Sequence, residues 1–562
     1  MRLPRPLAIH ASLITLALAP LLQAMAADAT IVSAARIHTM NPGQPQARAM
    51  AYDGSGRILA LGDIDALLER YPDAARIDAG AATIVPGLID AHGHVGDLGE
   101  TRLIADLVGT RGKQEVLERL REFASRNPGD GWLVGNGWDQ NDWPTKRFPT
   151  AADLDAAFPD RPVWLYRVDG HAGWANSAAL EAVRRDLHGD WQPEGGRIER
   201  DAQGKPTGVL IDAAMDLVED ARPAPEAAML ERTLQLGMQL AVQNGLTGVH
   251  DAGVPLEELR AYQRLADRGA LPLRINVMAK GNAALEELCR NGLYRHPSGR
   301  LQMRSVKLFA DGALGSRGAA LLADYSDDPG NRGLMLTSPQ ELADAVAKAK
   351  RCGVQPATHA IGDRGNHEIL EAYAKALGED AAGDHRWRIE HAQVLAPQDL
   401  PRLAQLHVIA SMQPTHATSD MPWAEDRLGH ERIAGAYAWR QLLDDGVRLA
   451  LGSDFPVESV EPRLGLYAAV TRTDAEGKPP GGWRAQEKLT AAEALRGFTL
   501  DAAYAGFNER EVGSLEPGKR ADFVILAEDP LGIDPAGLRK LDVRATYVDG
   551  KAVYQADGVS TD

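Results

Sequence analysis

The sequence predicts an α/β protein with parallel strands, placed between two β-rich ends. In the middle of the chain, short apolar runs such as RSVKLFADG and RWRIEHAQV alternate with Ala/Leu/Glu/Arg-rich segments typical of helices. Strand-then-helix repetition produces parallel strands, which form either a barrel or an open sheet. Residues 30–85 and the chain from 512 onward instead alternate apolar and small residues around Gly turns, as β-strands do.

The first residues have the pattern of a secretory signal peptide, which we assign to residues 1–26. Arg2 and Arg5 precede an apolar run that ends at Ala-Met-Ala, before polar chain begins. The run is too short for a membrane anchor, and no later stretch is long and uncharged enough to span a membrane. We therefore expect cleavage next to Ala26 or Ala27, and a periplasmic or secreted protein without a membrane anchor.

After the leader, the chain divides into a composite β unit and a larger αβ unit. Residues 28–85 and 506–562 are expected to form the β unit together, and residues 86–505 the αβ unit, with helices at 339–351 and 364–377. The first strand of the αβ unit is expected in TIVPGLIDAH. The stretch at about 97–243 is too long for one strand-to-helix connection, so we interpret it as an insertion beside the barrel or over its active site. Its many Trp residues predict either an aromatic pocket wall or a core: Trp132, Trp138, Trp143, Trp164, Trp174 and Trp191.

Charge and cysteine content restrict the class of protein. The net charge of −17 argues against a nucleic-acid or anionic-membrane partner. Cys289 and Cys352 are the only cysteines, and two in so long a chain do not make a disulfide framework. An exported protein could pair them, but we interpret them as two isolated, buried thiols.

Metal-ligand residue types lie where successive apolar runs end. His92 and His94 stand two residues apart after TIVPGLI, a spacing that directs both side chains to one side of a strand. His359 and His391 close two later runs, and Asp454 follows LALGS. The carboxyl ends of parallel barrel strands meet at one mouth, where catalytic groups of such barrels lie. Two imidazoles on one strand, followed by further ligand types in strand order, therefore predict a metal centre in which Asp454 also acts as proton acceptor.

Lys307 lies inside an apolar run, where an unpaired cation is costly. One interpretation pairs Lys307 with Asp311 at the barrel mouth. The other is a lysine carboxylated by CO2, whose carbamate could bridge two metal ions.

Together these motifs resemble the amidohydrolase superfamily. VPGLIDAHGHV is similar to its opening metal motif, and VGSLEPGKRADFVILAED to its C-terminal β segment. GNGWDQNDW, VDGHAGWANSAAL, VKLFADGALGSRGAAL, THAIGDRGN, RIEHAQV and SDFPVE resemble the YtcJ-like branch, also called amidohydrolase family 3. The resemblance covers almost the whole mature chain. It implies an α/β fold with a (β/α)8 TIM barrel, and a small β-sandwich formed by both termini.

The resemblance also implies ligands and a reaction. His92, His94, Lys307, His359, His391 and Asp454 match the metal positions of the superfamily. The expected cofactor is a divalent metal, often zinc, with one ion or, when Lys307 is carboxylated, two. Four further residues are expected near the strand ends, lining the substrate pocket or making structural contacts: Asp169, Asp311, Arg317 and His416.

The implied activity is hydrolysis of a C–N bond, as in the related N-substituted formamide deformylases. The expected partner is a small amide-type substrate, and a homodimer is left open. Two alternatives remain at this stage. One is hydrolysis of an ester, lactone or phosphoester at the same centre, and the other is a non-catalytic periplasmic binding protein.

Overall fold

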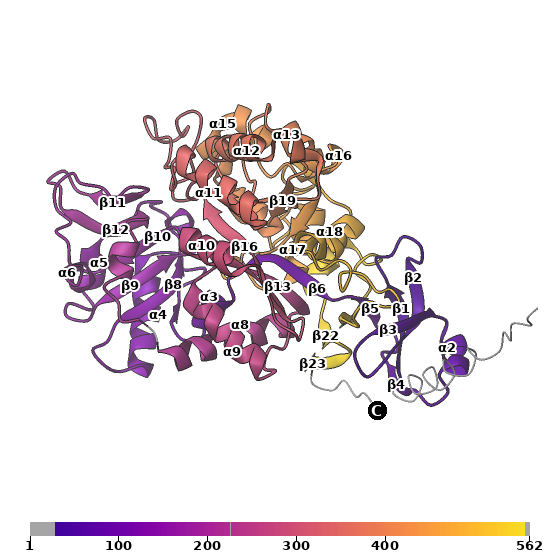
Figure 1. Ribbon diagram of the computed structural model, residues 1–562. Helices are drawn as coiled ribbons and strands as arrows, with labels where there is room; N and C mark the ends of the chain where they lie inside the picture. The colour runs from indigo at the N-terminus through magenta and orange to yellow at the C-terminus, as the bar shows by residue number, and fades with distance from the viewer. Residues whose placement is uncertain (1–28, 225, 557–562) are drawn as a thin grey trace, which may run out of the picture.

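The computed structural model describes residues 29–224 and 226–556. The signal peptide expected at residues 1–26 lies outside them. Three β-sheets organise the described chain, and Figure 1 shows the barrel in the middle, with the insertion on one side and a sheet built from both chain ends on the other. No helix in the described part of the chain is long and apolar enough to cross a membrane.

Eight parallel strands form the barrel, which confirms the predicted (β/α)8 fold. Neighbouring strands pair in the order β6-β13-β14-β16-β17-β18-β19-β20, and a short strand, β15 (Tyr294–Arg295), pairs antiparallel with β16. The barrel strands are β6 (Leu88–Gly93), β13 (Leu246–Val254), β14 (Arg274–Lys280), β16 (Leu301–Phe309), β17 (Gln355–Ala360), β18 (Arg388–His391), β19 (Ile409–Met412) and β20 (Leu449–Leu451).

The first and last barrel strands meet through close backbone contacts. The Asp454 N–H donates a hydrogen bond to the carbonyl oxygen of His92 at 2.7 Å. Gly452 lies so close to β6 that a Cβ atom there would stand 2.5 Å from Asp90 Oδ1 and 2.6 Å from His92 N. Only glycine fits this approach, which holds Asp454 beside His92.

The predicted helices at 339–351 and 364–377 are α11 (Pro339–Cys352) and α12 (Asp363–Leu377). Ser338 and Glu341 form a capping box at the start of α11, and Gly353 ends it at a φ of 66°. The other helices around the barrel are α8 (Ala227–Gln243), α9 (Leu256–Asp267), α10 (Gly281–Asn291), α13 (Leu400–Gln405), α14 (Pro414–Asp420), α15 (Ala424–Arg432), α16 (Trp439–Asp444), α17 (Pro462–Thr471), α18 (Ala491–Gly497) and α19 (Leu500–Ala505). Short 3-10 turns are η2 (Gly378–Ala382), η3 (Ile433–Gly435), η4 (Ala485–Glu487) and η5 (Pro535–Lys540).

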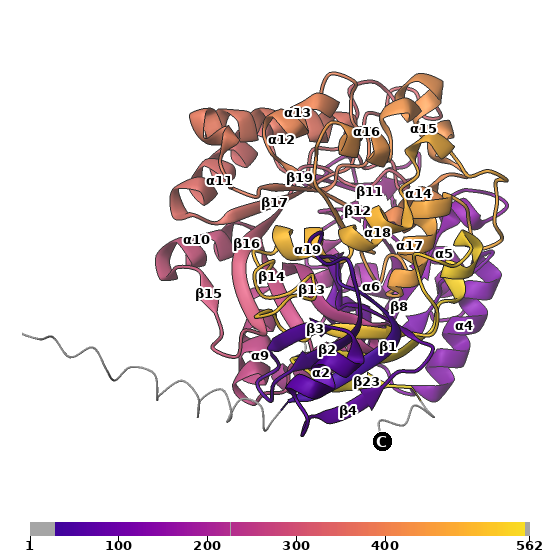
Figure 2. The ribbon, with the colours of Figure 1, turned by 90° about the vertical axis from the view of Figure 1, so that its right-hand side faces the viewer.

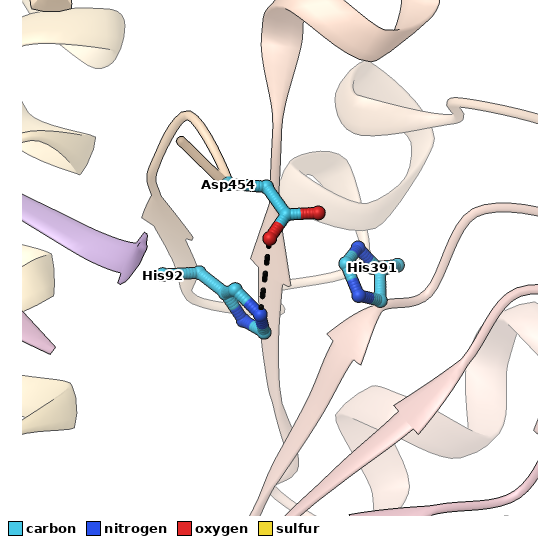
Figure 3. Close-up of side chains that lie close together, drawn as sticks. All are labelled: His92, His391 and Asp454. Carbon is cyan, nitrogen blue, oxygen red and sulfur yellow. Dashed lines mark ion pairs between the residues drawn. The ribbon is translucent and has the colours of Figure 1, made fainter. Parts of the chain in front are cut away.

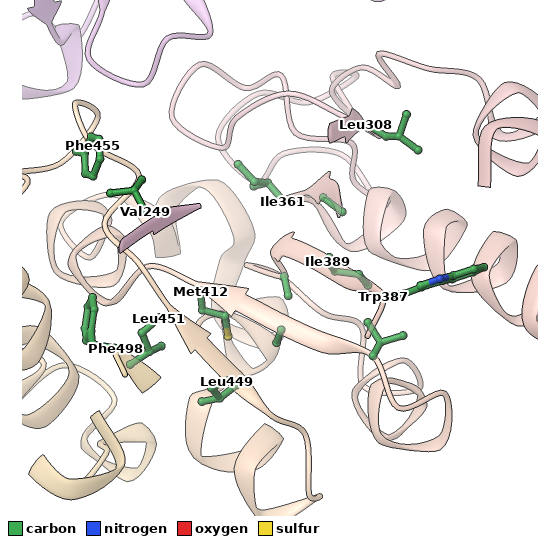
Figure 4. Close-up of a cluster of buried hydrophobic side chains, with 14 of the residues drawn as sticks. Val249, Leu308, Ile361, Trp387, Ile389, Met412, Leu449, Leu451, Phe455 and Phe498 are labelled. Carbon is green, nitrogen blue, oxygen red and sulfur yellow. The ribbon is translucent and has the colours of Figure 1, made fainter. Parts of the chain in front are cut away.

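The main apolar core joins barrel strands to the surrounding helices, and Figure 4 shows part of it, including Ile389, Met412 and Leu451. A polar network lies at the centre of the barrel instead. Arg388 on β18 donates to the Ala91 carbonyl of β6 at 2.7 Å and to Ser411 Oγ of β19 at 2.8 Å. Because this guanidinium is buried at the centre of the barrel, its positive charge needs a negative partner at the same place.

A disulfide joins Cys289 of α10 to Cys352 of α11, so the prediction of two isolated thiols is wrong. These helices follow consecutive barrel strands, β14 and β16, and therefore pack side by side. The two cysteines are 63 residues apart in the chain, yet their Cα atoms lie 5.1 Å apart. Sequence spacing did not reveal this proximity, because it arises only once the barrel is formed.

The insertion forms its own sheet, ordered β11-β12-β10-β9-β8-β7. Trp138, Trp143 and Trp174 pack in one of its cores, while Trp164 lies in a second core that Trp132 and Trp191 contact. The interpretation of these Trp residues as a pocket wall is therefore wrong. The elements are α3 (Val95–Glu100), β7 (Ala105–Asp106), α4 (Lys113–Arg126), β8 (Leu133–Trp138), η1 (Gln140–Asp142), α5 (Ala151–Asp155), β9 (Val163–Arg167), β10 (Ala172–Ala175), α6 (Ser177–Glu181), β11 (Gly196–Arg200), β12 (Pro206–Asp212) and α7 (Asp216–Glu219).

The third sheet combines both ends of the chain, and Figure 2 shows its first strands in indigo beside β23 in yellow. Val524 of β21 pairs antiparallel with Val85 of β5. TIVPGLIDAH, expected to be one strand, breaks at Gly87 into β5 of this sheet and β6 of the barrel. The elements are β1 (Thr30–His38), β2 (Gln46–Tyr52), β3 (Ile58–Gly62), α2 (Ile64–Arg70), β4 (Ala75–Asp78), β5 (Thr83–Pro86), β21 (Phe523–Leu526), β22 (Val543–Val548) and β23 (Lys551–Gln555).

Candidate metal centre

The carboxyl ends of the barrel strands place all six expected metal ligands around one cavity. Each residue comes from a different strand or the loop after it, except that His92 in β6 and His94 directly after β6 share one. The six expected ligands, all of which are among the residues lining this cavity, are His92, His94, Lys307, His359, His391 and Asp454.

Three of the six form the tightest group. His92, His391 and Asp454 each offer a ligand atom, and these atoms all lie within 4.8 Å of one another. Figure 3 shows the two rings and the carboxylate turned toward a common point. His94 Nε2 lies 2.9 Å from Asp454 Oδ1, and the ring of His359 lies 4.6 Å from that of His391. All five side chains are therefore within reach of a small metal centre.

Glu390 orients His92. His92 Nδ1 lies 2.6 Å from Glu390 Oε2, and both side chains are fully buried. The carboxylate in turn receives bonds from Arg388 at 2.6 Å and 2.9 Å. Burial alone would raise the pKa of Glu390, but Arg388 and His92 hold it far below its usual range. With Nδ1 donating to this anion, Nε2 of His92 presents its lone pair to the site.

Lys307 contacts His92, not Asp311, so the interpretation of a Lys307–Asp311 pair is wrong. Its Nζ lies 2.9 Å from His92 Nε2. Asp311 is used elsewhere and accepts backbone hydrogen bonds from Ala320, Ile361 and Gly362. Burial lowers the pKa of Lys307 to about 8.

The remaining ligand positions are electrostatically suited to a cation. Burial holds the pKa values of His359 and His391 well below normal, which keeps both rings neutral. His391 Nδ1 lies 2.8 Å from Gln413 Oε1, which leaves its Nε2 free for a metal. Burial alone would raise the pKa of Asp454, but nearby imidazoles hold it well below its usual range.

Two of the candidate ligands have an unusual backbone conformation. His391 has a φ of 73° and Asp454 a φ of 64°, both in the left-handed region that non-glycine residues rarely adopt. Such residues persist only where the surrounding structure fixes them, and they cluster at functional sites.

The donor set fits a divalent metal. Neutral imidazoles and a carboxylate are ligands that zinc and similar ions prefer. The buried Nε2 of His416 also has no hydrogen-bond partner among the described residues. It lies 3.6 Å from Asp454 Oδ2. A bound ion or substrate could provide the missing partner of His416 Nε2.

Of the four further expected residues, the structure brings two to the site. Asp169 and His416 line the cavities around the metal centre. Asp311 is fully buried beneath the mouth, binding backbone, and Arg317 pairs with Asp327 in a separate surface pocket. Of the two roles left open for Asp311 and Arg317, the structure shows the structural contacts.

Sequence reasoning missed a second His–carboxylate pair, on the insertion. His171 Nδ1 lies 2.6 Å from Asp212 Oδ1, and the His171 ring lies 5.2 Å from that of His359. Asp212 fits against the loop after β16 because that loop has glycines at 312 and 318, where a Cβ atom would lie 2.5–2.6 Å from Asp212 Oδ2. The insertion thus supplies a wall of the site. In the sequence, His171 lies in VDGHAGWANSAAL and the two glycines lie in GALGSRG, so these motifs could have indicated the contact.

The space around the centre has two parts. We call them the His94 lobe, a cavity of about 350 Å³ that also includes Tyr166 and Phe309, and the Trp423 lobe, about 460 Å³, that also includes Leu314 and Asp420. Both are lined by Asp169, His171, His359, His391 and Asp454, so the lobes meet at the metal centre. A cavity of about 560 Å³ near Leu88 and Leu541 contains none of the candidate ligands.

A (β/α)8 barrel with this ligand set at its mouth defines the class of protein, a metal-dependent hydrolase. The pattern of the amidohydrolase family matches residues 75–554, and the chain belongs to that family. It is similar to the putative amidohydrolase YtcJ of Bacillus subtilis (strain 168), with 35% identity over 90% of this chain and 95% of that one.

Two further proteins are similar to this chain over most of its length. The N-substituted formamide deformylase of Arthrobacter pascens is 31% identical over 94% of this chain and 99% of that protein. A crystal structure of an uncharacterized metal-dependent hydrolase from Pyrococcus horikoshii OT3 has a TM-score of 0.73 and 27% identity, covering 90% of this chain and 99% of that one.

Proposed function

We propose that this protein hydrolyses the C–N bond of a small amide. The observation that carries the proposal is the meeting of His92, His391 and Asp454 within 4.8 Å, at the junction of two cavity lobes. The similarity to an N-substituted formamide deformylase supports an amide rather than another bond.

The side chains of the site would have separate roles in metal binding and positioning. His92, His94, His359, His391 and Asp454 would hold a divalent metal, for which we propose zinc, and a carboxylated Lys307 would bridge to a second ion. Such a metal supplies a water of lowered pKa and polarises the carbonyl group of the substrate. Glu390 fixes the ring of His92, and the insertion contributes Asp169 and His171 to the cavity walls.

Asp454 moves the proton. Its carboxylate accepts a proton from the attacking water and passes it to the leaving nitrogen, because an amine leaves poorly unless it is protonated. Oδ1 of Asp454 faces His94 at 2.9 Å, while Oδ2 faces His416 at 3.6 Å. His416 is therefore placed to donate to the oxygen of the tetrahedral intermediate or to the leaving group.

The test is a matched panel assayed with metal-loaded protein. An amide, an ester, a lactone and a phosphoester with the same substituents are compared, beside metal content by elemental analysis. We expect amide turnover that is lost on chelation and returns with zinc. Turnover of esters alone would contradict the proposal, and metal binding without any turnover would indicate a binding protein.

We also propose that the protein is exported. The leader-like sequence at 1–26 motivates this, and the Cys289–Cys352 disulfide supports it, because disulfides persist in oxidising compartments. Intact-mass analysis of the secreted fraction should show a chain that starts near Ala27. Full-length protein retained in the cytoplasm would contradict export. A homodimer stays a prediction.

A further inference from the structure

The two lobes are each far larger than the smallest acyl group. A formyl group has two heavy atoms, roughly the volume of one or two water molecules of about 30 Å³ each. The His94 lobe measures about 350 Å³ and the Trp423 lobe about 460 Å³. Because the metal centre lies where they meet, a substrate with its scissile bond there extends into both lobes.

Among the described residues, carboxyl groups line much of the Trp423 lobe, and its one guanidinium, that of Arg167, is already paired. Arg167 donates from Nε to Gln140 at 2.8 Å, from Nη2 to Asp139 at 2.5 Å, and from Nη1 to Asp169. Each of its nitrogens therefore has a partner, and its charge is balanced by the carboxylates of Asp139 and Asp169. The carboxylates lining the lobe, apart from Asp454, are Asp139, Asp142, Asp169, Asp420 and Glu458.

Two polar groups in this lobe have unused bonding capacity. Oδ2 of Asp420 receives hydrogen bonds from Tyr437 at 2.6 Å and Gln393 at 3.1 Å, whereas Oδ1 receives none from the described residues. His416 is only 9% exposed, and its Nε2 also lacks a partner within the described chain. Trp423, whose ring the Arg427 guanidinium already covers at 5.4 Å, also lines this lobe.

The carboxylate of Asp454 indicates which part of the substrate enters this lobe. Oδ1 lies on the side of the candidate ligands His94, at 2.9 Å, and His92, at 3.5 Å, so Oδ2, on the side of His416, is the oxygen left to deliver a proton. The leaving nitrogen receives that proton and must lie on the same side. The amine part of the substrate therefore lies in the Trp423 lobe, and the acyl part in the His94 lobe.

We infer that the substrate is an N-acylated amine whose acyl group is larger than formyl and whose amine part carries a second, cationic group bound in the Trp423 lobe. This inference rests on the proposed amide hydrolysis and specifies its substrate class.

The experiment uses metal-loaded wild-type protein and four amides. Two contain 1,4-diaminobutane, whose free end is cationic, acylated with either a formyl or a benzoyl group. The other two contain pentylamine, which has the same number of heavy atoms and becomes uncharged once it is acylated, with the same two acyl groups. We expect kcat/KM to be at least 10-fold higher for the benzoyl diamine than for either the formyl diamine or the neutral benzoyl amide.

Asp420→Asn tests the lobe itself. This variant should reduce kcat/KM for the cationic benzoyl amide about 10-fold more than for the neutral one. Asp426→Asn is the matched control, because Asp426 lies on α15 in a surface pocket outside both lobes. It should leave the cationic preference unchanged.

The possible results distinguish a failure of the substrate inference from a failure of the proposed amide hydrolysis. Equal or faster turnover of the formyl diamine overturns the inference but leaves amide hydrolysis intact, and so does equal turnover of the neutral amide. A cationic preference that survives in Asp420→Asn also overturns it. Turnover of matched esters with no amide cleaved overturns the proposed function.

Discussion

Replacing Glu390 by Gln should weaken metal binding and destabilise the fold by two separable routes. Glu390 lies 2.6 Å from His92 Nδ1 and accepts two bonds from Arg388, and all three residues are fully buried. Residues that orient metal-binding histidines typically cost 10–100-fold in metal affinity when replaced. We therefore expect the metal dissociation constant to rise by about 10–100-fold.

The stability cost comes from Arg388. After the substitution its guanidinium keeps only neutral partners, Ala91 O, Ser411 and His250. Leaving one charge of a buried pair uncompensated costs about 3–5 kcal/mol. With an unfolding entropy of roughly 2 cal/mol/K per residue, this corresponds to a Tm about 3–5 °C lower for a chain of this length.

The assays are competition with a chromogenic chelator for affinity and calorimetry of the metal-free protein for stability. In the double variant Arg388→Met/Glu390→Gln, both charges are gone, so stability should recover while metal affinity stays low. Glu371→Gln is the matched control, because Glu371 is 58% exposed and pairs with Arg402 at the surface. Unchanged metal affinity in Glu390→Gln would refute the role of Glu390 in orienting His92.

Three further outcomes follow from the site and the fold. Asp454→Asn should retain metal but lower amide turnover about 100-fold or more, because the proton acceptor is lost; full activity would contradict that role. Lys307→Ala should bind one ion fewer per chain, with activity partly restored by short carboxylic acids; an unchanged metal count would rule out a bridging carbamate. Cys289→Ser/Cys352→Ser should lower the free energy of unfolding by about 4 kcal/mol in denaturant titrations, as the chain-entropy relation gives for residues 63 apart. An unchanged free energy of unfolding would show that the disulfide does not stabilise the fold by restricting the unfolded chain.

The parts predicted correctly were those that depend on one run of sequence at a time. Apolar runs predicted strands, and the polar residue that ends each run then fell at the barrel mouth, as with His359 and His391. Helix limits such as those of α11 were readable because a capping box and a C-terminal glycine are local signals.

The parts that sequence reasoning missed depend on contacts between distant segments. Glu390 stands one residue before His391 in a quoted motif, but its role appears only when β6 and β18 place it against His92. The disulfide needed the packing of α10 on α11 to be known. One of the two interpretations of Lys307 paired it with Asp311, but Asp311, four residues later, binds the backbone of the next loop instead.

The sheet that joins both chain ends also determines the order of folding. Pairing Val85 with Val524 closes a loop of more than 400 residues, which costs an unfolded chain about 5 kcal/mol of entropy. Once the barrel has formed, it already brings these two segments together, and that cost has been met. β1, β2 and β3 can pair with one another early, but β5 has to wait for β21, so the sheet stays incomplete until the last strands of the chain have been made.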